Sequence, residues 1–164
     1  MPDHPQVHIS LGEREAEVDE GIAELILELW RQDIDTTMSC QDNNGRVWAD
    51  FPSASDAEHF LDLVAGDYDD EVYSLYNRLV HEVEDEDWET FRAEHAWQYD
   101  CAPVDYNSAL YDDEGGLEKP AEDERFIQLH VSVRFPRYDY DEVLRRMKAS
   151  KEEPAPDDPA GKMR

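Results

Sequence analysis

The sequence predicts one α+β domain over residues 1–150, with a ferredoxin-like (split βαβ) antiparallel sheet and additional acidic helices. Stretches of period-two alternation are interleaved with stretches at helical spacing, and the front of the chain runs strand, helix, hairpin, helix. Hydrophobic residues make up 40% of the 164 residues, including 4 Trp, 8 Tyr and 5 Phe. This is too much apolar material for a disordered polyanion, so we expect a folded core.

The first elements are a strand and a helix. Apolar and polar residues alternate over 7–11, which predicts a half-buried strand. Apolar residues at helical spacing follow and predict a helix over 19–32. Its first residues, Asp19 and Glu20, are acids, which the N-terminus of a helix favours.

A hairpin and a second helix come next. The β-prone segments 36–41 and 46–51 flank Asn44-Gly45, and Asn-Gly is a strong hairpin signal because both residues tolerate positive φ. Ser55-Asp56-Ala57-Glu58 then matches a capping box, and Gly66 suits a helix C-cap. We therefore expect an antiparallel hairpin followed by a helix over 55–66.

The middle of the chain alternates acidic helices with strand patterns. Apolar spacing predicts a third helix over 72–83 and a shorter fourth helix over 88–96. Alternation over 97–103 predicts a strand, and the Gly- and Pro-containing segment 105–124 predicts a mobile loop.

The C-terminal part contains the longest strand pattern. Alternation over 127–135 predicts a strand that is central in the sheet. Asp139 or Asp141 can cap a final helix that reaches Lys148. Residues 151–164 contain three prolines without apolar periodicity, which predicts a disordered tail.

Two segments carry a resemblance to a group of known proteins. They are Asp19-Glu20-Gly21-Ile22-Ala23-Glu24-Leu25-Ile26, continuing to Leu29-Trp30, and Thr36-Thr37-Met38-Ser39-Cys40-Gln41. Together they resemble small, acidic, uncharacterised proteins of actinobacteria and their phages. The resemblance implies a shared βαβ front end and an actinobacterial or phage source. It implies no activity and no site.

The charge restricts the partners. The chain has 42 Asp and Glu against 15 Lys and Arg, a formal net charge of −27. Direct binding to nucleic acid or to an anionic membrane is disfavoured, because neutralising phosphates needs clustered cations. A basic partner protein is favoured instead. No apolar stretch is long enough to cross a bilayer and no signal peptide begins the chain, so we expect a cytoplasmic protein, in the host cytoplasm if phage-encoded.

The sequence predicts no catalytic residue, no cofactor and no metal site, and therefore no enzyme. Cys40 and Cys101 form no CxxC unit and are expected to be reduced, partly buried strand residues. The six histidines show no HExxH spacing, although His4 and His8 could chelate a metal weakly if the segment is extended. Residues 67–71 resemble a calcium loop but lack its glycine and its final glutamate.

The predicted partner-binding surface is an acidic stretch between residues 67 and 89. Carboxylates one helical turn apart lie ~5–6 Å from one another, close to the spacing of phosphates along a nucleic-acid strand. The leading hypothesis is therefore a non-enzymatic binding protein, a DNA-mimic-type inhibitor of a basic, nucleic-acid-binding host protein. Tyr68 and Tyr73 are expected to add aromatic contacts. The predicted site residues are Asp67, Asp69, Asp70, Glu71, Glu82, Glu84, Asp85, Glu86, Asp87, Trp88 and Glu89.

Three alternatives remain open at this point. The first is a small-ligand- or metal-dependent enzyme with Cys40, His130 or a carboxylate cluster at the sheet face. The second is a salt-adapted acidic domain with no mimic role. In the third, the cations of the C-terminal region pair with the acidic helix, within the chain or in a homodimer, and the acidic helix is then not available to a basic partner. These cations are Arg134, Arg137, Arg145, Arg146 and Lys148.

Overall fold

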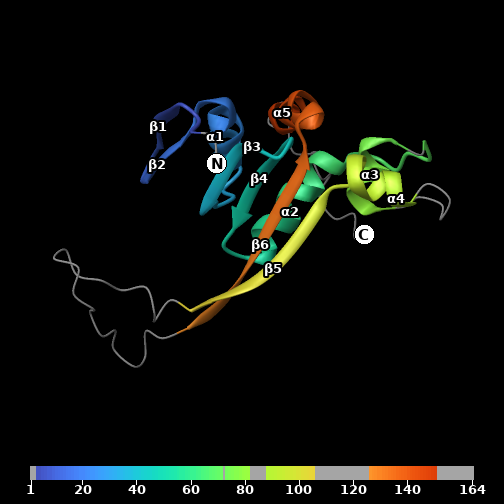
Figure 1. Ribbon diagram of the computed structural model, residues 1–164. Coiled ribbons are helices and arrows are strands. Elements are labelled where there is room, and N and C mark those ends of the chain that lie inside the picture. Colours follow the sequence, from blue (N-terminus) through green and yellow to red (C-terminus); the bar gives the residue numbers. More distant parts are fainter. Residues whose placement is uncertain (1–2, 72, 82–87, 106–125, 151–164) are drawn as a thin grey trace, which may run out of the picture.

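The computed structural model describes residues 3–71, 73–81, 88–105 and 126–150. In it, a two-stranded antiparallel hairpin lies beside a four-stranded antiparallel sheet of order β3-β4-β6-β5 (Figure 1). The strands are β1 (Gln6–Leu11), β2 (Arg14–Asp19), β3 (Met38–Asn43), β4 (Arg46–Phe51), β5 (Gln98–Asp105) and β6 (Ile127–Pro136). The predicted α+β class is confirmed.

The helices largely follow the predicted positions. They are α1 (Ala23–Arg31), α2 (Ala54–Ala65), α3 (Leu75–Val80), α4 (Trp88–Thr90) and α5 (Tyr140–Ala149), with 3-10 turns at Glu20–Ile22 and Arg137–Asp139 and a π-helical turn at Phe91–His95. The third helix is shorter than predicted: it begins after its N-cap Ser74, and His81, in a left-handed conformation (φ 61°), ends it. Within the described ranges, no helix has the length and apolarity needed to cross a bilayer.

The N-cap of helix α2 lies two residues before the predicted one. Ser53, in an extended conformation after β4, is the N-cap, and its Oγ accepts a hydrogen bond from the Asp56 backbone nitrogen at 3.1 Å. The same hydroxyl donates to Asp56 Oδ2 at 2.8 Å, so Ser53 and Asp56 form the cap and the predicted box at Ser55 is wrong. The predicted C-cap at Gly66 is confirmed, with φ 68°.

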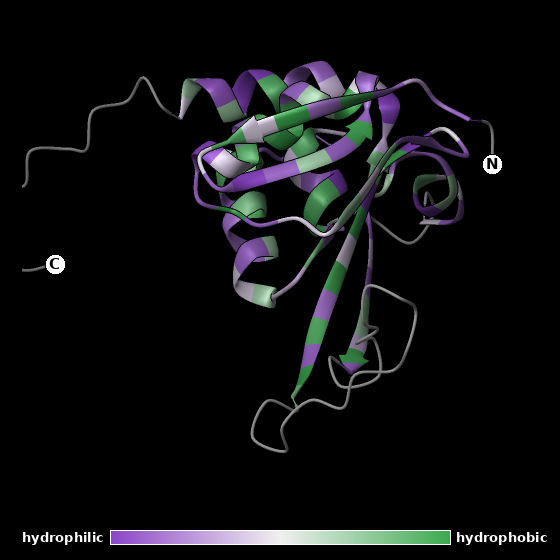
Figure 2. Ribbon diagram, turned by 90° about the vertical axis from the view of Figure 1, so that its left-hand side faces the viewer, coloured by the Kyte–Doolittle hydropathy of each residue, from purple (hydrophilic) through white to green (hydrophobic). Residues whose placement is uncertain are grey.

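The core lies between the four-stranded sheet and helices α1, α2 and α5. Strands β4 and β6 are central, as predicted for β6, and their alternating apolar residues include the buried Phe51 and Phe135. The alternation along β6 is visible as bands in Figure 2. Phe60 of α2 packs on both rings, with centroid separations of 5.5 Å and 6.5 Å. This packing fixes α2 across the sheet.

The predicted ferredoxin-like arrangement is not confirmed by the strand order. Strand β1 pairs with β2, in the register Val7↔Val18, and not with the four-stranded sheet. Strand β2 was absent from the prediction because Glu15 and Glu17 alternate with Ala16, which leaves little apolar signal. The order β3-β4-β6-β5 instead comes from two hairpin-like pairs joined along β4 and β6.

Helix α5 has a local carboxylate–guanidinium cluster that makes the stability depend on pH. Arg145 donates to both Glu142 oxygens (2.8 and 2.6 Å), and Arg146 Nε donates to Glu142 Oε1 at 2.8 Å. The hydrogen bonds from Arg145, and then from Arg146, lower the pKa of Glu142 from 4.5 to about 2. Since the folded pKa lies below the unfolded one, this stabilisation is complete above pH 4.5 and is lost as the pH falls toward 2.

We therefore expect the difference in unfolding free energy between the wild type and Glu142→Gln to be largest at pH 6 and clearly smaller at pH 3. Urea unfolding followed by tryptophan fluorescence at both pH values measures it. Glu58→Gln, on an exposed position of α2, serves as the control for removing one carboxylate. A difference for Glu142→Gln that is independent of pH would contradict the assignment.

Candidate binding groove between two edge strands

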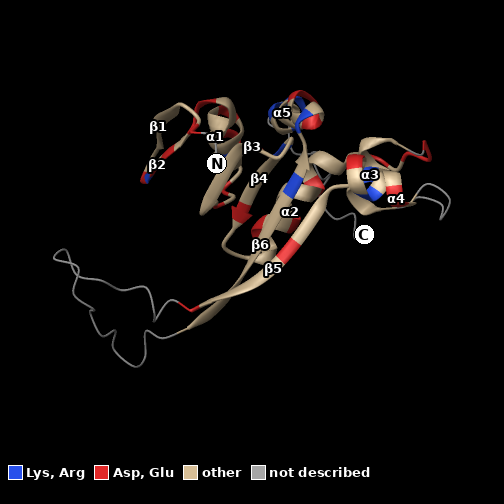
Figure 3. Ribbon diagram, viewed as in Figure 1, with Lys and Arg blue, Asp and Glu red and all other residues tan. Residues whose placement is uncertain are grey.

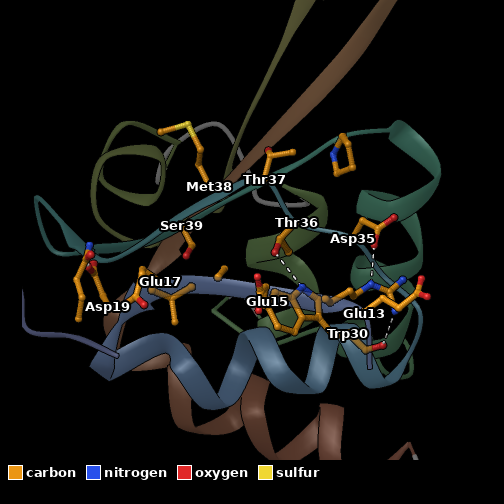
Figure 4. A pocket seen from close by; sticks show the side chains of 15 residues that line it. Glu13, Glu15, Glu17, Asp19, Trp30, Asp35, Thr36, Thr37, Met38 and Ser39 are labelled. Atoms are coloured by element: carbon orange, nitrogen blue, oxygen red, sulfur yellow. Dashed lines mark hydrogen bonds and ion pairs between the residues drawn. The ribbon is translucent and has the colours of Figure 1, made fainter. Parts of the chain in front are cut away.

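Strands β2 and β3 face each other across an open groove. In the part of the chain that the structure describes, β2 pairs only with β1 and β3 pairs only with β4. A groove of about 660 Å³ separates their other edges (Figure 4). An edge strand presents a row of backbone N–H and C=O groups without a strand partner. The two walls of this groove are therefore both templates for an additional strand.

Side chains close the groove at one end. The Gln41 backbone nitrogen donates to Asp19 Oδ2 at 3.0 Å, and the Gly21 nitrogen donates to Gln41 Oε1 at 2.7 Å. A Cβ atom on Gly21 would lie only 2.5 Å from Gln41 Oε1, so a larger residue at this position would displace the Gln41 amide. At this end of the groove, these two hydrogen bonds replace backbone hydrogen bonds between β2 and β3, and they set the distance between the two strands.

A guanidinium holds the other end. Arg14 donates from Nη2 to Asp33 Oδ1 at 2.7 Å and from Nε to Asp35 Oδ1 at 2.8 Å, which ties β2 to the loop after α1. The hydrogen bonds with Asp33 and then with Asp35 raise the pKa of Arg14. Trp30 Nε1 donates to Thr36 Oγ1 at 3.3 Å on the opposite wall, as Figure 4 shows. The groove is thus anchored at both ends and open between them.

The groove is acidic. Its lining contains one guanidinium, Arg14, whose charge is offset by the two aspartates that it binds. Carboxylates lining a cleft raise the local concentration of cations. The side chains of Glu15 and Glu17 lie along β2, opposite Met38 and Ser39 (Figure 4). The carboxylate residues of the lining are Glu13, Glu15, Glu17, Asp19 and Asp35.

The acidic stretch predicted from the sequence lies elsewhere. Asp67, Asp69, Asp70 and Glu71 are exposed in the segment between α2 and α3, and Glu89 is exposed in α4. In Figure 3, acidic residues are marked red in the segments beside α3 and α4, on the opposite side of the view from the β1–β2 hairpin. The other predicted acids lie outside the described residues, and they are Glu82, Glu84, Asp85, Glu86 and Asp87.

The aromatic residues of this stretch differ in their exposure. Tyr68 is 69% exposed, whereas the Tyr73 ring lies 4.8 Å from the His95 ring. Trp88 is half-buried, with its ring stacked 6.1 Å from that of Phe91. Tyr68 therefore has the most surface available for a partner, while Trp88 contributes to packing within the protein.

The two cysteines occupy different environments. Cys40 is buried, as predicted, and burial raises the pKa of its thiol, which disfavours a free thiolate nucleophile. Cys101 is exposed, and the prediction that it is partly buried is wrong. It lies on β5, which among the described strands is the outer strand of the sheet beside β6.

A buried polar network crosses the sheet at Asp50. Its Oδ2 lies 2.8 Å from His130 Nδ1, and its Oδ1 accepts from Ser132 Oγ at 2.9 Å. Thr37 Oγ1 also donates to Asp50. The network joins β4, β6 and Thr37, the residue before β3, and sequence spacing could not reveal it because its members come from separate segments of the chain. Cys40, the other residue of the enzyme alternative, lies in a different cluster with His4 and Asp19.

The C-terminal cations pair within the chain, but not with the acidic stretch. Arg134, Arg137 and Lys148 pair with acids of other elements, whereas Arg145 and Arg146 pair with Glu142 of their own helix, α5. Of the two alternatives for these cations, pairing within the chain with the described acids of residues 67–89 is therefore not found. Arg78, the cation inside that stretch, is buried against Asp139. The pairs are Arg134–Asp100, Arg137–Asp42, Arg145–Glu142, Arg146–Glu142 and Lys148–Glu24.

Comparison of the chain with protein-family models, with curated proteins and with solved structures finds no match. The functional argument therefore depends on the groove and the charges of this chain.

Proposed function

We propose that the protein is a non-enzymatic binding protein that holds a basic, extended segment of a partner protein between β2 and β3. One observation carries this proposal: two edge strands face each other across an acidic groove. An extended peptide between them can form main-chain hydrogen bonds with both walls, as in β-strand addition. Lysines or arginines at alternate positions would then lie near Glu15 and Glu17.

The size of the groove fits a short segment. Strand β2 has six residues, but Arg14 anchors one end of the groove and Asp19 closes the other, so the residues between them form the open wall. At ~3.3 Å per residue, this wall is ~13 Å long and accommodates about four residues of an extended partner. Basic arms of this kind are typical of nucleic-acid-binding proteins. The proposal thus keeps the predicted class of partner, and occupation of such an arm would withhold it from nucleic acid.

A second candidate surface supports the DNA-mimic form of this function. Asp67, Asp69, Asp70 and Glu71 are exposed within five consecutive residues. In this form, the carboxylates occupy the nucleic-acid-binding surface of a host protein in place of phosphates. A phage origin of the protein is part of this second candidate and rests on the sequence resemblance.

The groove proposal predicts binding of a labelled peptide in which lysine and threonine alternate over ten residues. At 50 mM NaCl, we expect Glu15→Lys/Glu17→Lys to weaken its affinity by about tenfold or more, because like charges then line the groove. The matched control is Asp67→Lys/Asp69→Lys, which changes the net charge equally outside the groove. Fluorescence anisotropy measures both affinities, which should fall as NaCl rises.

A second peptide tests the backbone pairing. Proline in place of the threonines keeps every lysine but removes every second backbone N–H donor, so we expect clearly weaker binding. Equal binding of both peptides would contradict strand addition. An equal loss of affinity in both charge-reversed variants would show that the peptide responds only to the net charge of the protein. A loss of affinity confined to the Asp67/Asp69 variant would favour the mimic surface. If the wild type does not bind the peptide, the groove proposal is wrong, and the acids of the groove form a solvated or salt-adapted surface.

A further inference from the structure

Three potential metal ligands from distant parts of the sequence meet beside the closed end of the groove. They are His4, before β1, Asp19, at the end of β2, and Cys40, in β3. One ligand atom of each lies within 4.8 Å of those of the other two. Asp19 and Cys40 are buried, with 6% and 5% exposure, and His4 is half-buried. The fold, and not a local motif, assembles this cluster.

Neighbouring groups orient two of the ligands. The Gln41 nitrogen donates to Asp19 Oδ2 at 3.0 Å, and Gln6 Nε2 lies 3.4 Å from Asp19 Oδ1. His4 Nε2 lies 3.2 Å from the Asp42 carbonyl oxygen. A donor bond to that carbonyl leaves the other ring nitrogen to ligate, and carbonyl partners of this kind orient the histidine ligands of metal sites. The cluster therefore has part of the outer shell that a metal site needs.

We propose that His4, Asp19 and Cys40 form a binding site for a divalent transition-metal ion of the Zn²⁺ class. A thiolate, an imidazole and a carboxylate are the three ligand types that Zn²⁺ accepts, at ~2.0–2.3 Å. Ca²⁺ and Mg²⁺ prefer oxygen ligands, and Asp19 is the one residue of this set that offers an oxygen. A tetrahedral ion draws its ligand atoms ~3.4–3.8 Å apart, so small side-chain rotations close the site.

The position of the site suggests its consequence. An ion there would join the segment before β1, the end of β2 and strand β3, and so fasten the hairpin to the sheet. Three protein ligands leave one coordination position of a tetrahedral ion for water or another donor. Asp19 also lines the groove, so the metal site adjoins the closed end of the groove. The metal site does not depend on the proposed peptide binding.

Cobalt titration of the reduced, full-length protein tests the site. Many surface carboxylates of this chain bind cations weakly, so millimolar Mg²⁺ is included and the readout is the near-ultraviolet thiolate-to-cobalt band, which carboxylates do not produce. We expect one Co²⁺ per chain with this band, and its loss when Zn²⁺ is added. Cys40→Ser should abolish the band, whereas Cys101→Ser, which removes the exposed cysteine, should preserve it.

A second pair of variants tests the histidine without disturbing the core. His4→Ala should weaken Co²⁺ binding by about tenfold or more, and His8→Ala, on the exposed side of β1, should not change it. Absence of the band in the wild type would overturn the proposal. So would a band that persists in Cys40→Ser, or an affinity that is unchanged in His4→Ala. Circular dichroism establishes that each variant is folded, and His4→Ala decides the question if Cys40→Ser is not.

Discussion

Asp139→Ala is expected to lower the free energy of unfolding by about 3–5 kcal/mol, because it leaves the buried guanidinium of Arg78 without a counter-ion. Arg78 Nη1 lies 2.6 Å from both carboxylate oxygens of Asp139, and Trp97 Nε1 donates to Asp139 Oδ2 at 3.0 Å. The side chains of the ion pair are only 10% and 4% exposed. Removing the carboxylate therefore costs one charge partner and one indole partner at once.

The matched control is Asp100→Ala, which removes an ion pair of the same type at the surface. Asp100 lies 3.2 Å from Arg134 and is 76% exposed, so its loss should cost less than about 1 kcal/mol. Urea unfolding followed by tryptophan fluorescence compares the variants. Similar losses of unfolding free energy for Asp139→Ala and Asp100→Ala would show that the buried ion pair contributes no more to stability than the surface pair.

A double variant distinguishes the effect of an unpaired buried charge from the effect of lost hydrogen bonds. Arg78→Met/Asp139→Leu removes both, and replacing a buried ion pair with apolar residues is often neutral or stabilising. We expect it to recover most of the loss caused by Asp139→Ala alone. A double variant as unstable as the single one would assign the effect to lost hydrogen bonds of Trp97 and the backbone, not to the unpaired charge.

The sequence predicted the elements whose apolar residues alternate clearly. Strands β4 and β6 lie where predicted and β3 lies two residues further along the chain, because their apolar residues face the core and the turn of the hairpin contains Asn44-Gly45. Strand β2 was missed, since acids and alanine carry its alternation. Asp139 was predicted as a cap and does stand at the N-cap of α5, but it makes no side-chain cap bond and binds Arg78 instead.

The candidate sites were less accessible from sequence than the fold. The exposed acids at 67–71 follow from composition, because a run of charged residues has no other place than the surface. The groove is made by two strand edges, and whether an edge is free depends on sheet order, which no local pattern encodes. His4, Asp19 and Cys40 have no metal-binding spacing in the sequence, and they meet only because β2 ends beside β3.

Phe60→Ala is expected to destabilise the protein by about 3–5 kcal/mol, because it opens a cavity where α2 meets the sheet. Phe60 is 1% exposed, and its ring centroid lies 5.5 Å from that of Phe51 and 6.1 Å from that of Trp97. Tyr68→Ala, which truncates an aromatic residue that is 69% exposed, should cost less than about 1 kcal/mol. Chemical unfolding compares both with Phe60→Leu, which keeps most of the volume and should fall between them. Equal effects of Phe60→Ala and Tyr68→Ala would contradict the position of α2 on the sheet, and with it the core that supports β4 and, through β4, the β3 wall of the groove.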